Sequence, residues 1–183
     1  MEAFVYLRVR PGHLVEVRNQ LTGSAAARRS TVVIGDWDVL CLIDGPDLST
    51  IGTGVISEIH VIEGVERTYT APVVPADRLG VVGFGGLPTP PIIQGACYVH
   101  VRAEAGAAAG LYERFADIAE VSGAAVLGGR WDLIACVAEP WEVASGLVLE
   151  KVQALPGVRE TSTLVSVDYE EPSEDRDQFS SWS

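Results

Sequence analysis

The chain has 183 residues, of which 48% are hydrophobic and 21% charged, a mixture that allows a full globular core. Its formal net charge of −12, from 13 basic and 25 acidic residues, repels a phosphate backbone and argues against direct nucleic-acid binding. No apolar run reaches the roughly 18 residues of a membrane span, and no signal-peptide pattern is visible. We therefore expect a cytoplasmic protein without a membrane partner.

The first half of the chain predicts six elements from its hydrophobic periodicity. Strands are indicated by apolar residues at every second position, and helices by apolar residues three or four positions apart. Asp47 or Ser49 can cap the second helix by accepting a backbone hydrogen bond. The expected elements are a strand at 3–10, a helix at 13–21, strands at 31–34 and 39–43, a helix at 48–62 and a strand at 67–74.

The second half of the chain repeats the first. The hairpin Gly35-Asp36-Trp37-Asp38 recurs as Gly129-Arg130-Trp131-Asp132, at an offset of 94 (131 − 37). The opening strands match at an offset of 92 when Tyr98 is aligned with Tyr6. Helical spacing and apolar runs predict the remaining elements around Leu111, Phe115 and Ile118, at 124–127 and 133–137, around Val148, Val152 and Leu155, and at 161–167.

This order predicts an α+β protein made of two tandem ferredoxin-like βαββαβ repeats. We expect the first repeat at 1–75 and the second at 94–168. Residues 76–93 are rich in proline and glycine and predict a linker, whose apolar residues favour contact with the protein surface. The acidic tail at 169–183 lacks periodic apolar residues and is expected to be disordered.

Several short motifs in both halves carry a family resemblance. They are Val9-Arg10-Pro11-Gly12-His13, the G-x-W-D hairpin, Gly64-Val65-x-Arg67-Thr68-x-Thr70 and Leu155-Pro156-Gly157-Val158-Arg159-x-Thr161-x-Thr163. In these motifs each repeat resembles the ligand-binding (RAM) module of the Lrp/AsnC family. The resemblance implies modules that pair through their sheets, assemble into rings and bind amino acids near the interfaces. A tandem chain can form that pair internally, as a pseudo-dimer of the dimeric α+β barrel type.

Regulators of this family also carry an N-terminal helix-turn-helix domain. Here the first strand begins at about Ala3, which leaves no room for one. The chain is therefore similar to a stand-alone, tandem form of the module. A helix-turn-helix homologue becomes a candidate partner, beside self-association and a small-molecule ligand.

The hairpins and the last strands supply the candidate ligand-binding residues. Asp38 and Asp132 can pair with a ligand ammonium while hairpin N–H groups take its carboxylate, or they only stabilise the turn. The two tryptophans can wall a pocket, anchor a subunit contact or pack at the tip. The threonines form two pairs, and the two members of each pair share one face of a strand. Their hydroxyls can bind polar groups of a ligand, or the threonines are there only because they favour β-strands. The full set is Gly35, Asp36, Trp37, Asp38, Thr68, Thr70, Gly129, Arg130, Trp131, Asp132, Thr161 and Thr163.

The two hairpins differ in charge because Arg130 replaces Asp36. If each hairpin forms a site, the two bind different ligands or only one has kept its function. The three histidines lack metal-ligand spacing, and the three cysteines lie in apolar runs typical of buried thiols. We expect no metal and no cofactor.

These observations predict a non-enzymatic sensor of an amino acid or related metabolite, acting in transcriptional regulation through oligomerisation or a DNA-binding partner. One alternative is a scaffold that binds partners and has vestigial pockets. A second is a small α+β barrel enzyme of the monooxygenase or haem-handling type. His100 is the only strand histidine; alternation predicts it on the outer face, with Arg8 as its counterpart.

Overall fold

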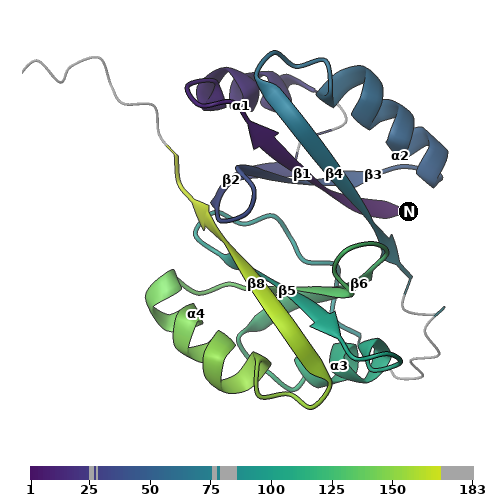
Figure 1. Cartoon of the computed structure of the whole chain (residues 1–183), viewed down its shortest axis with the longest axis vertical. Coiled ribbons are helices and arrows are strands. Elements are labelled where there is room, and N and C mark those ends of the chain that lie inside the picture. The colour runs from purple at the N-terminus through teal and green to yellow at the C-terminus, as the bar shows by residue number, and fades with distance from the viewer. Residues whose placement is uncertain (25–26, 28, 76–77, 79–85, 170–183) are drawn as a thin grey trace, which may run out of the picture.

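Two βαββαβ repeats follow one another in the computed structural model, which describes residues 1–24, 27, 29–75, 78 and 86–169 (Figure 1). The first repeat comprises β1 (Glu2–Val9), α1 (Leu14–Gly23), β2 (Arg29–Ile34), β3 (Val39–Asp44), α2 (Leu48–Gly54), the π-helical turn η1 (Val55–Ile59) and β4 (Val65–Val74). The second comprises β5 (Cys97–Ala103), α3 (Ala108–Phe115), β6 (Val121–Leu127), β7 (Leu133–Val137), α4 (Trp141–Leu147), the π-helical turn η3 (Val148–Val152) and β8 (Val158–Val167). The predicted fold class is confirmed.

The eight strands close into one antiparallel barrel in the order β1-β3-β2-β8-β5-β7-β6-β4. Two joints connect the repeats: β2 pairs with β8, and β4 pairs with β6. Closure leaves neither repeat with a free sheet edge. The predicted intramolecular pseudo-dimer is therefore confirmed, and its two halves bond through their strand edges.

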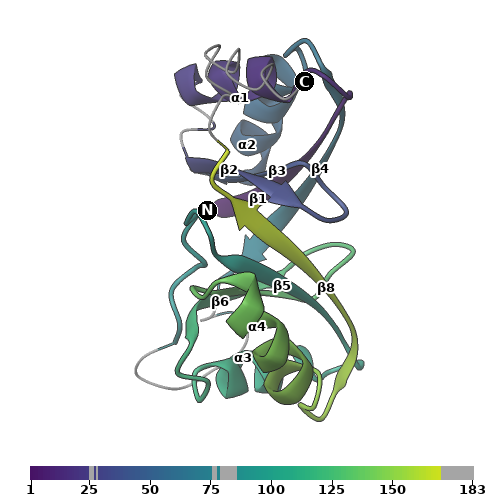
Figure 2. The same cartoon turned by 90° about the vertical axis from the view of Figure 1, so that its left-hand side faces the viewer.

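The barrel lies between two helical layers, with α1 and α2 on one side and α3 and α4 on the other (Figures 1 and 2). Each repeat has a core between its own sheet and helices, and a third core fills the barrel. The third core is rich in aromatic side chains: Phe4, Tyr6, Trp37, Tyr98 and Trp131. The alternating strand pattern therefore has two buried faces, one towards the helices and one towards the barrel interior.

The predicted helix signals act as expected at α2. The Asp47 carboxylate caps this helix by accepting a hydrogen bond from the Thr50 backbone N–H at 2.8 Å. Of the predicted apolar stripe, Ile51, Val55, Ile59 and Ile62 are buried, whereas Leu48 is 46% exposed. Leu48 lies in the first turn, where α2 has not yet reached the sheet.

The described part of the linker packs against the second repeat. The Leu87 carbonyl accepts a hydrogen bond from the Tyr112 hydroxyl at 2.7 Å, and the Pro88 carbonyl accepts one from the Ala124 N–H at 3.0 Å. The expected boundaries at 75/76, 93/94 and 168/169 stay predictions. Residues 76–77 and 79–85 of the linker and 170–183 of the tail lie outside the described residues. No helix in the described part of the chain is long and apolar enough to span a membrane.

Strand register corrects the internal alignment. Tyr6 pairs with Leu40 and Tyr69, and His100 pairs with Ile134 and Ser162. The opening strands therefore match at an offset of 94 (100 − 6), not 92. The counterpart of His100 is Tyr6, and the prediction that it is Arg8 is wrong.

Candidate functional site

A cavity of about 260 Å³ opens at one end of the barrel, where both hairpin loops project on the same side (Figure 2). Both repeats line this one cavity, whereas the sequence suggested a separate site at each hairpin. The first repeat contributes Tyr6, Asp36, Trp37, Arg67, Thr68 and Tyr69, and the second contributes His100, Arg130, Trp131, Ser162 and Leu164. Four pairs of these residues occupy equivalent positions in the two repeats, so the pseudo-two-fold axis runs through the cavity: Tyr6 and His100, Asp36 and Arg130, Trp37 and Trp131, and Tyr69 and Ser162.

Each hairpin reaches across to the last strand of the other repeat. The Arg130 N–H donates to the Tyr69 hydroxyl at 2.6 Å, and the Ser162 hydroxyl donates to the Asp36 carboxylate at 3.2 Å. The tip glycines permit this approach. Gly35 and Gly129 have φ of +144° and +141°, and a Cβ on either would overlap Leu164 or the Tyr69 hydroxyl.

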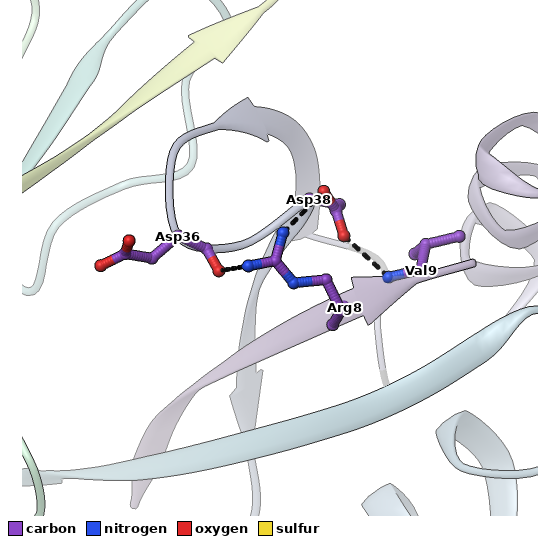
Figure 3. Close-up of polar contacts among 4 residues, drawn as sticks. All are labelled: Arg8, Val9, Asp36 and Asp38. Atoms are coloured by element: carbon purple, nitrogen blue, oxygen red, sulfur yellow. Dashed lines mark hydrogen bonds and ion pairs between the residues drawn. The ribbon is translucent and has the colours of Figure 1, made fainter. Parts of the chain in front are cut away.

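The aspartates shared by the two hairpins fix strands and are not among the cavity-lining residues. Asp38 accepts a hydrogen bond from the Val9 N–H at 2.8 Å and forms an ion pair with Arg8 at 3.4 Å (Figure 3). Arg8 also donates to the Asp36 carbonyl, while the Asp36 carboxylate extends away from Arg8 (Figure 3). Asp132 likewise accepts from the Ala103 N–H at 2.8 Å. Both carboxylates therefore anchor a hairpin to the end of β1 or β5.

The predicted threonines share a face, as expected, but that face points towards the helices. Thr68 and Thr161 hydrogen-bond His60 and Gln153 at 2.7 and 2.8 Å. Thr70 and Thr163 pair across the ladder with Val5 and Val99, which belong to the helix-side cores. Thr68 alone of the four also lines the cavity.

The residues beside these threonines face the cavity instead. Tyr69, Ser162 and Leu164 were missed because the threonine hydroxyls drew attention to the other set of alternating positions. Arg67 shares their alternation and was quoted only as part of a motif. The bulky aromatic Tyr69, flanked by threonines on both sides, was the signal that marked the inner face.

Tyr6 and His100 meet across the pseudo-two-fold axis. The Tyr6 hydroxyl lies 2.8 Å from His100 Nε2, and both side chains are buried. Burial lowers the pKa of His100 from 6.5 to about 4, against smaller opposing effects of a hydrogen bond to the Ser162 backbone and the Asp36 charge. Burial, with the neighbouring Tyr69, raises the pKa of Tyr6. At neutral pH both groups are therefore uncharged, and the histidine tautomer decides which of them donates the hydrogen bond.

The burial of His100 corrects another expectation. Its side chain is 2% exposed and points into the barrel, so its predicted placement on the outer strand face is wrong. Moving the alignment by two residues does not change which residues share a strand face. Both faces of this strand are buried, one towards the helices and one towards the barrel interior. Alternation alone could not say which face carries the histidine.

Two guanidinium groups and two indole rings form part of the cavity wall. Arg67 lies over Trp37 at 5.0 Å from the ring centroid, and Arg130 lies over Trp131 at 5.5 Å. Trp37 stacks on Tyr69 with ring centroids 6.2 Å apart. Among the described residues neither Arg67 nor Arg130 has a carboxylate ion-pair partner. Two guanidinium groups are thus available to a bound anion.

Metal-ligating side chains do not gather in the part of the chain that the structure describes. No group of three or more histidine, cysteine, aspartate or glutamate side chains there could hold a metal ion. Cys41, Cys97 and Cys136 are buried free thiols. Burial raises the pKa of Cys41 to about 12, which makes this thiol a poor nucleophile or metal ligand.

The sequence matches no known family model and no curated protein. The fold is similar to that of the siroheme decarboxylase NirDL, over 92% of this chain and 71% of that chain, with 12% identity and a TM-score of 0.66. The same enzyme in complex with an iron-uroporphyrin III analogue gives a TM-score of 0.65. At such low identity this likeness shows the fold, the dimeric α+β barrel.

Shorter matches cover 38% of the chain. TTHA0845 from Thermus thermophilus has 28% identity over 86% of that chain, and FFRP-DM1 has 20% identity over 92%, each with a TM-score of 0.36. Matches with these TM-scores carry no argument, and membership of the Lrp/AsnC family stays a prediction.

The expectation of a non-enzymatic protein is contradicted by the likeness to NirDL. A solved structure that shares this fold over 92% of the chain is an enzyme. The barrel therefore gives no ground for excluding catalysis, and the function must be argued from the cavity.

Proposed function

We propose that the cavity on the pseudo-two-fold axis binds a small metabolite of amino-acid size that carries a carboxylate. The observation that carries this proposal is the pair of guanidinium groups, Arg67 and Arg130, that face one cavity without carboxylate partners among the described residues. Arginine forms bidentate hydrogen bonds with carboxylates, and stacking on tryptophan holds its planar group in place.

The size of the cavity supports a compact ligand. Pockets for drug-sized molecules occupy about 300–1,000 Å³, and this cavity of about 260 Å³ lies just below that range. A tetrapyrrole macrocycle of the kind bound to NirDL would require the two hairpins to move apart. The aromatic wall offers apolar contact for the body of a smaller metabolite.

A ligand in this position can act as a signal because both repeats contact it. Binding at the axis would stabilise the arrangement of the two hairpins, and any difference in affinity between two arrangements shifts their populations. We propose that the response passes to other molecules by oligomerisation or through a DNA-binding partner.

A ligand screen with matched variants tests the proposal. Thermal unfolding is measured with each amino acid and small carboxylate at millimolar concentration, for the wild-type protein, Arg130→Gln and the exposed control Arg114→Gln. A ligand at 100 times its Kd stabilises by about 2.7 kcal/mol, a shift that Arg114→Gln should keep and Arg130→Gln should lose. The absence of any shift, or an equal shift in both variants, would contradict binding in this cavity and favour a scaffold.

Decarboxylation is a second candidate function, favoured by the buried Tyr6–His100 pair beside the guanidinium groups. A carboxylate held by arginine can leave as CO₂, and one proton must then replace it on carbon. The Tyr6 hydroxyl, which lies 2.8 Å from His100 Nε2 and lines the cavity, is the candidate proton carrier. Incubation with the amino acids and small carboxylates of the ligand screen tests this candidate: a mass loss of CO₂ that Tyr6→Phe abolishes supports it, and unchanged compounds contradict it.

A further inference from the structure

We infer that the ligand is an amino dicarboxylate, with one carboxylate on Arg67, the other on Arg130 and the ammonium group on Asp36. This inference rests on the proposed function and specifies its ligand class. It starts from the charged side chains that line the cavity, which are two guanidinium groups and one carboxylate. A molecule with two carboxylates and one ammonium group has the complementary set.

The two guanidinium groups belong to different walls of the cavity. Arg67 comes from β4 of the first repeat and lies over Trp37, whereas Arg130 comes from the hairpin of the second repeat and lies over Trp131. Each is held by its own indole ring. A ligand with a single carboxylate would satisfy one arginine and leave the other without an anion, so two anionic groups use the site fully.

Asp36 selects against a dicarboxylate that lacks a positive charge. One of its oxygens accepts the hydrogen bond from Ser162 at 3.2 Å, and its backbone carbonyl is occupied by Arg8. The carboxylate would repel a purely anionic ligand and attract an ammonium group. Because Asp36 and Arg130 are counterparts, the same pair of positions carries opposite charges and gives the ligand a direction.

The counterpart of Arg67 confirms that the cavity is asymmetric. Glu160 occupies the equivalent position on β8, and it forms an ion pair with Arg102 at 3.3 Å instead of lining the cavity. A ligand with two-fold symmetry would therefore meet unlike groups at its two ends. Glutamate and aspartate have unlike ends, since one carboxylate lies next to the ammonium group and the other is distant.

Calorimetric titration with three closely related probes tests the inference. L-Glutamate has both carboxylates and the ammonium group, L-glutamine lacks the second carboxylate, and glutarate lacks the ammonium group. With wild-type protein we expect L-glutamate to bind about tenfold or more tightly than either analogue, since each analogue lacks one charge-assisted hydrogen bond. L-Aspartate, titrated in parallel, reports which chain length fits.

The variants assign each charge of the ligand to its partner. Arg67→Gln and Arg130→Gln should each reduce the preference for L-glutamate over L-glutamine or weaken both, while the control Arg114→Gln changes neither. Asp36→Asn, which keeps the hydrogen bond to Ser162, should reverse the order of L-glutamate and glutarate. Equal affinity for L-glutamate and L-glutamine in the wild type would overturn the inference and leave carboxylate binding intact. No binding of any probe, together with a negative ligand screen, would overturn both.

Discussion

The two repeats differ mainly where they face each other. Their scaffolds are alike: each has a hairpin glycine with positive φ, a buried tryptophan and an aspartate that accepts the N–H at the end of the first strand at 2.8 Å. Apart from Trp37 and Trp131, the paired cavity positions have diverged. Tyr6 stands opposite His100, Asp36 opposite Arg130, and Tyr69 corresponds to Ser162.

This contrast separates folding from function. In a homodimer the axis would repeat every side chain, so a residue near it would always meet its own copy. A tandem chain can change each copy independently, and here it has placed unlike charges and unlike hydrogen-bonding groups in one cavity. Residues shared by the repeats therefore hold the barrel together, and residues that differ are candidates for ligand recognition.

The largest expected effect comes from breaking the shared scaffold at a hairpin tip. Gly129→Ala would force a Cβ into the Tyr69 hydroxyl at a φ of +141°. Backbone strain and overpacking together should cost about 2–5 kcal/mol of unfolding free energy, measured by urea denaturation. The control Gly110→Ala lies in α3 with open space around it and should be neutral or slightly stabilising. Equal stability of the two variants would contradict the tight crossing of the hairpins.

The next effect concerns pH and involves only the second repeat. The pKa of His100 falls from 6.5 in the unfolded chain to about 4 in the fold, so between these values the unfolded chain binds more protons. The stability that this pKa difference contributes is fully present above pH 6.5. It decreases towards pH 4, by up to about 3 kcal/mol at 1.36 kcal/mol per pKa unit. The difference in stability between wild type and His100→Gln should shrink over this range.

The control for this pH effect is His60→Gln. His60 is exposed and outside the barrel, so its variant should follow the wild-type pH profile from 6.5 to 4. A wild-type pH profile that matches the profile of His100→Gln would show that His100 titrates as it does in water.

Removal of either shared aspartate should lower the unfolding free energy by less than the changes above, and by a similar amount in each repeat. Asp38→Ala and Asp132→Ala each leave a backbone N–H without its acceptor, at Val9 or Ala103. Each should lower the unfolding free energy by about 1–3 kcal/mol. Two values within about 1 kcal/mol of each other would fit a common scaffold, whereas a loss confined to one repeat would not.

The smallest effect is expected from the partly exposed ion pairs beside the hairpins. Arg102 pairs with Glu160 at 3.3 Å, with exposed side-chain fractions of 42% and 49%. Arg102→Gln should change the unfolding free energy by less than about 1 kcal/mol, and less still at high salt. A larger loss would mean that stacking of Arg102 on Trp131 matters more than its charge.

The sequence was sufficient for the order of elements because strand alternation, helical spacing and the Asp47 cap are local signals. The repeated hairpin indicated a duplicated unit, and the resemblance to the Lrp/AsnC module implied that its two halves pair. The offset of the opening strands was two residues out because it rested on the similar residues of 6–10 and 98–102. The register of strand pairing, which sets the offset at 94, cannot be read from such a match.

The candidate site was only partly accessible from the sequence. The hairpin motif drew attention to Asp36, Trp37, Arg130 and Trp131, which line the cavity. Tyr6 and His100 lie 94 residues apart, and only closure of the barrel brings them to 2.8 Å. Strand propensity likewise cannot tell the helix side from the barrel side when both are buried, so the threonines were chosen in place of Tyr69 and Ser162.

The central claim is that two repeats form one site on their shared axis. Isothermal titration calorimetry with L-glutamate, at known protein concentration, measures the number of ligands per chain. We predict one ligand per chain, with binding weakened both by Asp36→Asn in the first hairpin and by Arg130→Gln in the second. Two ligands per chain, or a hairpin variant that removes half of the sites and leaves the other half unchanged, would contradict a single site.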